Sequence, residues 1–277
     1  MLISATPINA SNEVELGARL FTDPELSISG TMSCATCHQP DHHYTDQRKL
    51  AIGVNGDLLA RNTPTLYNSG RAASLGWDTN GTGSLEAQHR IPLFAVNPPE
   101  MGSSPAHLTT VLESYAAEIT AIYDVQPMDL DADRAEQIVT SALAAFVRSL
   151  SHPANGFDAY LFNDDQSALG AAARRGLDLF TSPRLGCSNC HRGIRFGGPD
   201  HPEPPRFHVT QVAGSQLQIR TPTLRAVRHT APYMHAGQLP NLIAVIEHYE
   251  QTPAPEVPDF KLSAQERADL IAFLHSL

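Results

Sequence analysis

The chain of 277 residues has few cysteines, a single tryptophan and no long hydrophobic run. No apolar run reaches about 18 residues, so the sequence predicts no membrane-spanning helix. Basic residues are also in deficit, because 19 lysines and arginines stand against 29 aspartates and glutamates, which gives a formal net charge of −10. That charge argues against nucleic acid as a partner, since phosphates would be repelled. Hydrophobic residues make up 42% of the chain, enough for a packed core.

All four cysteines fall in two copies of the pattern C-x-x-C-H, which consist of Cys34, Cys37 and His38 and of Cys187, Cys190 and His191. The pattern is typical of covalent haem attachment, in which two thiols add across the vinyl groups of one porphyrin and the adjacent histidine becomes an axial ligand. A zinc knuckle, a redox dithiol and structural disulfides are the alternatives. A zinc ribbon has its pairs roughly 15–20 residues apart, whereas the two pairs here are 150 positions apart, and a dithiol needs no histidine. The sequence therefore predicts two haem c groups.

An internal repeat surrounds these motifs. Leu20-Phe21-Thr22 precedes the first motif and Leu179-Phe180-Thr181 precedes the second, while Thr63-Pro64-Thr65-Leu66 and Thr221-Pro222-Thr223-Leu224 follow them in the same order. The repeated order predicts two related haem domains. A proline and a glycine follow a predicted helix end at 151–156, which favours a junction there. The predicted domains are residues 1–154, with the first haem, and residues 155–277, with the second.

Hydrophobic periodicity predicts helices rather than strands. Apolar side chains recur about every 3.6 residues over 139–150 and over 169–180. Ser263 and Glu266 form a capping-box pattern, and Ser104-Pro105 is typical of a helix start. Segments 51–104 and 192–240 are rich in Gly, Pro and Asn and are predicted to be long loops. The predicted fold class is mainly α, with two cytochrome c-like haem domains related by internal duplication, long loops and little strand.

Together these residues resemble the bacterial dihaem cytochrome c peroxidase and MauG family. The resemblance extends from Leu20 to Leu274, and it is carried by the two haem motifs with Gly186, Arg61–Thr65, Trp77-Asp78, Gln88, Asn97–Gly102, Thr221–Arg225 and Thr230–Gly237. It implies that the amino-terminal haem reacts with hydrogen peroxide. It also implies that the carboxy-terminal haem stores or relays the second oxidising equivalent.

The branch of the family depends first on the distal side of the amino-terminal haem. Classical peroxidases carry a histidine about sixteen residues after the proximal histidine, and Val54 occupies that place here. Because valine cannot bind iron, we expect a five-coordinate haem that is open to peroxide without prior reduction. His42 and His43 are the alternative capping ligands, although they lie earlier on the loop.

The second deciding position is the distal ligand of the carboxy-terminal haem, which is methionine in the peroxidases and tyrosine in MauG. The resemblance places Tyr249 there, with Met234 and His248 as rivals and a core tyrosine as the structural alternative. A phenolate is an anionic donor that stabilises ferric and higher iron states. This ligand therefore favours storage of an oxidising equivalent over electron delivery at high potential.

The resemblance also implies a peroxide pocket lined by Gln88, Pro92 and Glu100. Glu100 would take a proton from the peroxide and return it to the leaving oxygen. Gln88 would hydrogen-bond the peroxide, and Pro92 would shape the pocket. Pro92 and Glu100 are eight positions apart, whereas the family more often has six, so we expect a bulge over 93–96.

Several further assignments follow from the resemblance alone. Trp77 would lie between the two haems and let them share charge. Arg225 and His235 would lie near propionates of the second haem. One calcium ion would bind at Asn62 and the backbone carbonyls of Thr230 and Pro232, with water completing its shell. MauG has a surface tryptophan where this chain has Leu185, so a surface relay would need tyrosine or another route.

The function that the resemblance implies is a haem-dependent oxidoreductase of the MauG-like branch. It would use hydrogen peroxide to oxidise a residue of a partner protein at long range, through a high-valent state shared by both haems. The alternative is a dihaem cytochrome c peroxidase that takes electrons from a small cytochrome or cupredoxin, and Val54 and Tyr249 argue against it. A third hypothesis is a non-enzymatic electron carrier with two six-coordinate haems.

The expected compartment is the periplasm, because covalent haem attachment in bacteria takes place outside the cytoplasmic membrane. Residues 1–6 lack the charged-then-apolar layout of a secretion signal, so we expect that a signal peptide has been removed from this sequence. Seven arginines lie over 184–228 against two acidic residues. We favour pairing of these arginines with haem propionates and nearby carboxylates over a docking face for a partner.

Overall fold

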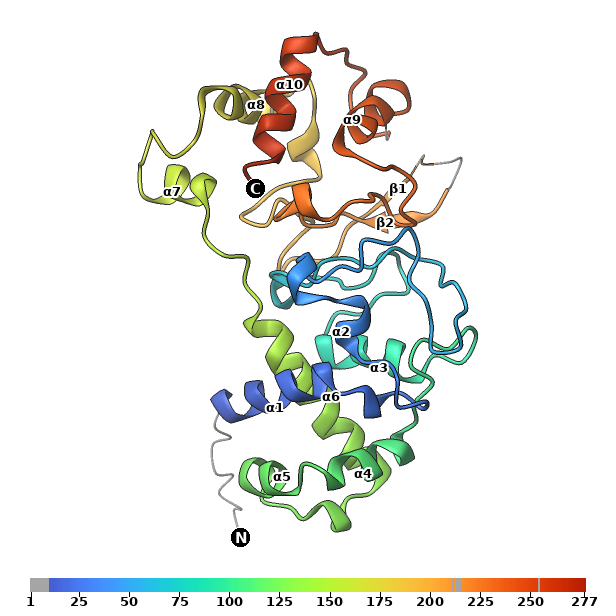
Figure 1. The fold of residues 1–277 in the computed structure, drawn as a ribbon. Helices are drawn as coiled ribbons and strands as arrows, with labels where there is room; N and C mark the ends of the chain where they lie inside the picture. The colour runs from blue at the N-terminus through green and yellow to red at the C-terminus, as the bar shows by residue number, and fades with distance from the viewer. Residues whose placement is uncertain (1–9, 211, 213–215, 254) are drawn as a thin grey trace. The chain divides into compact units, whose positions relative to one another are not determined.

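The computed structural model describes residues 10–210, 212, 216–253 and 255–277, and residues 1–6, on which the expectation about a signal peptide rests, lie outside them. The described chain is mainly helical (Figure 1). Its α-helices are α1 (Ala10–Thr22), α2 (Cys34–Cys37), α3 (Leu85–Phe94), α4 (Pro105–Glu113), α5 (Ala116–Tyr123), α6 (Ala132–Ser149), α7 (Gly156–Phe162), α8 (Ala171–Thr181), α9 (Leu242–Gln251) and α10 (Ala264–Leu274). No helix within these described ranges is long and apolar enough to cross a membrane.

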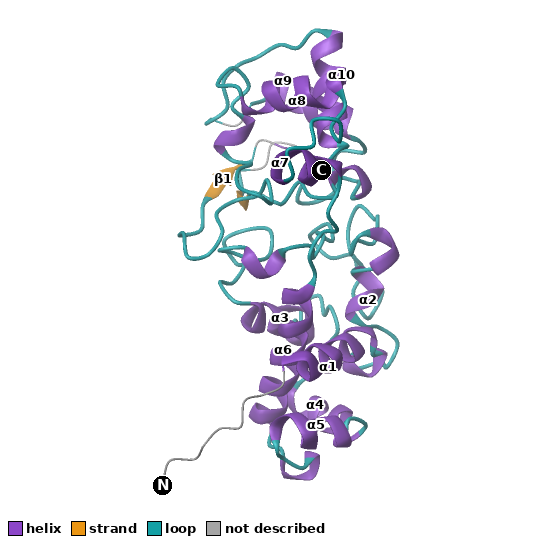
Figure 2. Ribbon diagram, turned by 90° about the vertical axis from the view of Figure 1, so that its left-hand side faces the viewer, coloured by secondary structure: helices purple, strands orange, loops and turns teal. Residues whose placement is uncertain are grey.

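Strand content is low. Strands β1 (Phe207–Val209) and β2 (Gln218–Arg220) form one antiparallel pair, in which Phe207 lies opposite Arg220 and His208 opposite Ile219. Long loops connect most of the helices (Figure 2). The predicted fold class, mainly α with long loops and little strand, is confirmed.

The chain divides into two compact units. The first contains the chain up to Cys37 together with Ile52–Leu59 and Ser84–Leu150, and the second contains His38–Ala51, Ala60–Gly83 and Ser151–Leu277. The chain passes for the last time from the first unit to the second at Leu150 and Ser151. The two predicted haem domains, with their boundary between residues 154 and 155, stay a prediction.

In the first unit, α1 packs against α6. A side chain at Gly17 would collide with the carbonyl oxygen of Ala142 and approach Cβ of Phe146 to 2.9 Å. Glycine is therefore required where these two helices cross. The apolar stripe predicted over 139–150 forms the buried face of α6, where Val139, Leu143 and Val147 are almost fully buried.

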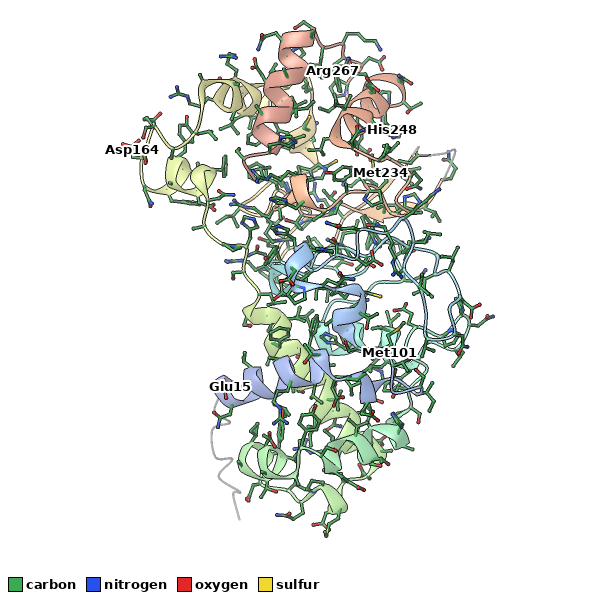
Figure 3. All side chains as sticks on the ribbon, in the orientation of Figure 1. Glu15, Met101, Asp164, Met234, His248 and Arg267 are labelled. Carbon is green, nitrogen blue, oxygen red and sulfur yellow. The ribbon has the colours of Figure 1, made fainter. Side chains whose placement is uncertain are left out.

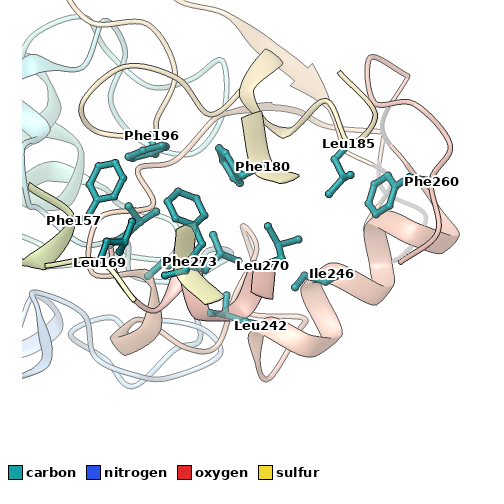
Figure 4. Packing of buried hydrophobic residues seen from close by; sticks show 14 residues of the cluster. Phe157, Leu169, Phe180, Leu185, Phe196, Leu242, Ile246, Phe260, Leu270 and Phe273 are labelled. Carbon is teal, nitrogen blue, oxygen red and sulfur yellow. The ribbon is translucent and has the colours of Figure 1, made fainter. Parts of the chain in front are cut away.

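The second unit repeats this arrangement with α8 and α10. A side chain at Gly176 would collide with the carbonyl oxygen of Asp269 and approach Cβ of Phe273 to 2.7 Å. Gly176 stands three residues before Leu179, as Gly17 stands three before Leu20. The core of this unit surrounds Phe273, whose ring lies 5.2 Å from Phe180 and 5.7 Å from Phe196 between centroids (Figure 4).

Two predicted helix starts are confirmed. The Ser104 side chain accepts a hydrogen bond from the backbone N–H of His107, and Ser263 forms a complete capping box with Glu266. The prediction of one long loop over 51–104 is wrong in part, because α3 occupies Leu85–Phe94. Pro92 lies inside this helix, where its missing N–H removes only one hydrogen bond of the helix.

Candidate functional site

The thiols of the first C-x-x-C-H motif lie on α2 in the first unit. Burial raises the pKa of Cys34 to about 12, with smaller contributions from Cys37 and from the carboxylate of Glu100. The thiol is therefore neutral and lies close enough to Glu100 to be affected by its charge. This places the predicted distal carboxylate and a predicted haem-attachment cysteine in one neighbourhood.

His38 is oriented by the loop that follows it. Its Nδ1 lies 3.0 Å from the carbonyl oxygen of Tyr44, a residue with φ of +59°. The hydroxyl of Thr65 donates to the preceding carbonyl, that of His43, at 2.7 Å. Because Nδ1 faces an acceptor, it carries the proton, and Nε2 keeps its lone pair for a metal.

His191 is held in the same way within the second unit. Its Nδ1 lies 2.9 Å from the carbonyl oxygen of Phe196, whose φ is +49°. The hydroxyl of Thr223 donates to the carbonyl of Arg195, again the residue before the left-handed one. Burial lowers the pKa of His191 to about 4, so the ring is neutral and able to bind iron. The repeated T-P-T sequence thus supports a proximal histidine in both halves.

Three of the predicted distal residues come together in the first unit. The backbone N–H of Val54 donates to the carbonyl oxygen of Glu100 at 2.7 Å, and that of Met101 donates to the carbonyl of Pro92 at 3.0 Å (Met101 is labelled in Figure 3). Gln88 lies one helical turn before Pro92 on α3. The loop after α3 therefore folds back on the helix and brings Glu100 beside Val54.

The environment of Glu100 suits a proton carrier, because burial raises the pKa of its carboxyl group above the ordinary value. The predicted bulge over 93–96 is replaced by the last turn of α3, which ends at Phe94 and is followed by the loop. The longer spacing between Pro92 and Glu100 is accommodated in that loop.

The second motif opens onto a cavity of about 250 Å³ that lies wholly within the second unit. Its wall is largely apolar and includes most residues that the resemblance assigned to the second haem and its surroundings: Cys187, Cys190, His191, Tyr249, Met234, His248, Trp77, Asn62, Thr230, Pro232 and His235. Segments far apart in the sequence thus converge on one space.

Tyr249 lines the cavity together with the two other candidate distal ligands, Met234 and His248. Burial raises the pKa of Tyr249 to about 12, and the nearby Cys190 and Cys187 add to the shift. Tyr249 lies on the same face of α9 as the buried Leu242 and Ile246. His248 instead has its Nδ1 3.0 Å from the hydroxyl of Thr252, while Met234 lies on a loop at φ +73° (both are labelled in Figure 3). The assignment of Tyr249 as iron ligand stays a prediction.

Trp77 lies in the wall of this cavity with its indole fixed. Its Nε1–H donates to the carbonyl oxygen of Asn62 at 2.6 Å. Asn62 is itself buried, its backbone N–H donates to the carbonyl of His235 at 3.0 Å, and its side-chain amide donates to the carbonyl of Arg48 at 2.7 Å. The residue predicted to bind calcium therefore also orients the tryptophan.

The calcium assignment itself stays a prediction. Asn62, Thr230 and Pro232 all line the cavity. No cluster of three His, Cys, Asp or Glu suitable for a metal occurs among the described residues, but the predicted shell consists of amide and carbonyl oxygens. His235 is buried beside them and accepts a hydrogen bond from Gln238.

Unlike the other residues that the resemblance assigned to the second haem, Arg225 is not part of the cavity wall. Its guanidinium pairs with Asp158 at 2.8 Å, donates to the carbonyl of Ile194 and lies over the ring of Phe157. Its predicted contact with a propionate stays a prediction. Leu185 is fully buried in the core of the second unit and does not reach the surface.

Arg220 in the cavity wall was not singled out by sequence reasoning, which placed it only among the seven arginines over 184–228. It directly precedes Thr221-Pro222-Thr223, as Asn62 precedes Thr63-Pro64-Thr65, and both residues contact Trp77. The repeat was the signal that could have identified it. Most of the other arginines over 184–228 follow the favoured interpretation, since Arg184, Arg192, Arg195 and Arg225 pair with carboxylates.

The residues present fit haem. Each motif supplies two half-buried thiols and a histidine whose Nδ1 faces a backbone carbonyl, and in the second unit these line a largely apolar cavity. The fold and the two motifs define a dihaem protein of the c-type class. The family model for di-haem cytochrome c peroxidase matches residues 11–166.

Relatives extend this match over nearly the whole chain. The methylamine utilization protein MauG of Methylorubrum extorquens is 37% identical, over 96% of this chain and 78% of its own length. The cytochrome c551 peroxidase of Pseudomonas aeruginosa is 32% identical, over 95% of this chain and 78% of its own. A MauG-like protein associated with microbial copper homeostasis has a similar solved structure, with a TM-score of 0.85, 28% identity and coverage of 100% and 93%. The chain therefore belongs to the dihaem cytochrome c peroxidase and MauG family, and it is a haem-dependent oxidoreductase.

Proposed function

We propose that this protein is a periplasmic dihaem enzyme that uses hydrogen peroxide to oxidise a residue of a partner protein at long range. The observation that carries the proposal is the position of Val54, whose backbone is bonded to Glu100 and whose side chain cannot bind iron. The first haem, held by Cys34, Cys37 and His38, would supply the redox chemistry of iron with peroxide. An apolar side chain at this point leaves the distal position open without prior reduction.

Proton transfer at the peroxide is the task of Glu100. As a carboxylate it accepts the proton of the bound peroxide oxygen, and as the acid it returns that proton to the leaving oxygen. Burial raises its pKa, so the protonated form is more accessible than for an exposed glutamate. Gln88, one turn from Pro92 on α3, holds the peroxide in place.

In the second unit, Tyr249 and Trp77 would determine how the second haem takes part. As a ligand of the second haem, Tyr249 would bind as phenolate and would have to release the proton that burial holds on it. The phenolate favours the ferric state. Trp77 lines the same cavity, with its indole fixed by Asn62, and is the aromatic group through which the two haems would share charge.

The second candidate is a peroxidase that takes its electrons from a small cytochrome or cupredoxin. It is favoured by the similarity to cytochrome c551 peroxidase at 32% identity. The two functions differ in their activation requirement. We therefore propose to measure peroxide consumption by the ferric protein as isolated, with reduced cytochrome c as donor, before and after reduction of one haem.

A MauG-type enzyme consumes one equivalent of peroxide per dihaem centre without prior reduction, and cytochrome c accelerates its turnover little. A conventional peroxidase shows little consumption until one haem is reduced and then oxidises cytochrome c rapidly. The second pattern would replace the proposed function by the second candidate.

We further propose that the two halves arose by duplication and that a calcium ion binds at Asn62. The duplication is supported by the matched contacts of Gly17 and Gly176 and of Thr65 and Thr223. The calcium ion is supported by the common location of Asn62, Thr230 and Pro232 in the cavity wall. The periplasm is supported by the two haem-attachment motifs.

A further inference from the structure

Arg220 is a partly buried cation without a carboxylate partner. It ends β2, and it lines the cavity of the second unit. Its Nε donates to the carbonyl of Gly76 at 2.8 Å and its Nη1 to the carbonyl of Thr221 at 3.3 Å. No carboxylate among the described residues forms an ion pair with it, and residues 1–9, 211, 213–215 and 254, which the description omits, include no Asp or Glu.

Two neighbouring arginines are buried and do have carboxylate partners, so the lack of such a partner for Arg220 is an exception. Arg195 pairs with Asp200, and Arg225 pairs with Asp158 at 2.8 Å. A buried guanidinium without an opposite charge is unfavourable, because the protein interior solvates it poorly. Burial, with a smaller contribution from the charge of Arg195, lowers the pKa of Arg220 to about 10, so Arg220 stays protonated at neutral pH. The cavity wall thus carries a positive charge that an anionic ligand would balance.

The same cavity contains Cys187, Cys190 and His191, where haem is expected to attach. Haem carries two propionate carboxylates, and a guanidinium binds a carboxylate in a fork of two N–H donors. Two donor groups of Arg220 already contact backbone carbonyls, which fixes the direction of the guanidinium.

Arg220 also holds the segment that carries Trp77. Its backbone N–H donates to the carbonyl of Trp77 at 2.9 Å, its Nε donates to Gly76, and the adjacent Ile219 forms a β-bridge with Asp78. The indole itself is fixed by its bond to Asn62. One residue therefore faces the cavity and at the same time fixes the backbone on either side of the peptide that carries Trp77.

We propose that Arg220 binds a propionate of the second haem and positions Trp77 relative to it. The inference rests on the assignment of a haem to the second motif and not on the reaction with peroxide. Arg220 is a positioning residue in this account, because it acts on Trp77 through the backbone.

The test compares Arg220→Gln and Arg220→Lys with Arg192→Gln, in the holoprotein with both haems attached. Arg192 is a matched control, because it directly follows the second haem motif, pairs with Glu203 and is not part of the cavity wall. Spectroelectrochemical titration gives the potential of the second haem across the neutral pH range. Resonance Raman spectroscopy reports the propionate bending mode of that haem and, with ultraviolet excitation, the indole of the single tryptophan.

Loss of the positive charge in Arg220→Gln should lower the potential of the second haem, since a nearby cation favours the reduced state. The freed propionate should titrate at higher pH, so the potential of this variant should rise as pH falls. The hydrogen-bond-sensitive band of Trp77 should shift in the same variant. Arg220→Lys keeps the charge but loses the fork, so it should retain most of the potential and shift the propionate mode. Arg192→Gln should leave both Raman bands unchanged.

A wild-type potential with wild-type pH dependence in Arg220→Gln would overturn the propionate contact. If that variant does not retain the second haem, an unshifted propionate mode in Arg220→Lys would overturn it equally. An unshifted indole band in Arg220→Gln would overturn the positioning of Trp77. None of these measurements uses peroxide, so failure here is distinct from failure of the proposed function.

Discussion

At the residue scale, Glu100 is the group whose titration should be visible in the reaction. Burial raises its pKa, and the proposed proton acceptor is the carboxylate form. The rate of reaction with peroxide should therefore rise as pH increases through this raised pKa. Glu100→Gln should slow the reaction by about 10²-fold or more and remove this acidic limb, with both haems still attached. Stopped-flow absorbance gives both results, and unchanged kinetics would remove Glu100 from the mechanism.

The same raised pKa has a consequence for stability. A carboxyl group with a folded pKa above its unfolded value favours folding less and less as pH rises above the unfolded value. Glu100→Gln removes that cost, so the variant should be more stable than wild type at alkaline pH. The difference in melting temperature should shrink as the pH falls toward the ordinary pKa of glutamate. A difference that is constant with pH would show that Glu100 is not responsible.

Val54 gives a second prediction at this scale. Its backbone is fixed to Glu100, so a histidine there would be held near the predicted distal side of the first haem. Val54→His should convert this haem from high spin to low spin and slow its reaction with peroxide until one haem is reduced. Val54→Ala is the control and should stay high spin. An unchanged spectrum in Val54→His would show that the loop alignment is wrong.

The sequence singled out some of the candidate functional residues but not others. The predicted haem ligands follow from a local pattern. The backbone of Val54 contacts that of Glu100 and Met101 contacts Pro92, while the pocket of Gln88, Pro92 and Glu100 stays a prediction. Arg220 was not distinguished from the other arginines over 184–228, because an arginine usually faces solvent and only the tertiary structure shows that this one lines the cavity without an opposite charge.

At the element scale, the contact of α8 with α10 depends on Gly176. A methyl group there has no space, since it would meet the backbone of Asp269 and Cβ of Phe273. Gly176→Ala should lower the free energy of unfolding by about 3 kcal/mol. Gly170→Ala, in the same unit with no atom within 4 Å of the added methyl group, is the control and should change it by less than about 0.5 kcal/mol. Equal effects in a chemical denaturation experiment would contradict this account of the helix contact.

Helices with a clear apolar stripe or cap were predictable from sequence, as α6 and α10 show. Helix α3 was not, because Pro92 and a weak apolar pattern suggest a break. Its stability derives in part from tertiary contacts, in which the backbone N–H groups of Met101 and Ser103 bond to carbonyls at its end. Such contacts between a helix and a returning loop leave no periodic signal in the sequence.

At the scale of the whole molecule, the cavity of the second unit is lined in part by residues that precede position 84 in the sequence. Asn62–Thr65 and Trp77 line it, although they precede the predicted boundary at residues 154 and 155. A fragment of residues 155–277 with haem attached should therefore melt at a lower temperature and show an altered spectrum of its haem. The control is the full chain with Cys34→Ala and Cys37→Ala, which lacks the first haem but retains residues 38–83. A fragment that matches this control would support the predicted domain as an independent unit.

The duplicated order of motifs was visible in the sequence, but the discontinuous composition of the two units was not. Local periodicity identifies helices, whereas the return of the segments 38–51 and 60–83 to the second unit depends on long-range contacts. These include the bonds from Arg220 to Gly76 and Trp77 and from Asn62 to His235.

The central claim is that the first haem is open to peroxide before any reduction. It is tested most directly by electron paramagnetic resonance of the ferric protein, before and after one equivalent of hydrogen peroxide. The account predicts one high-spin and one low-spin haem, and both signals should be largely lost on addition of peroxide to the unreduced protein. Two low-spin haems that do not react with peroxide until one of them is reduced would contradict it and would identify a conventional cytochrome c peroxidase.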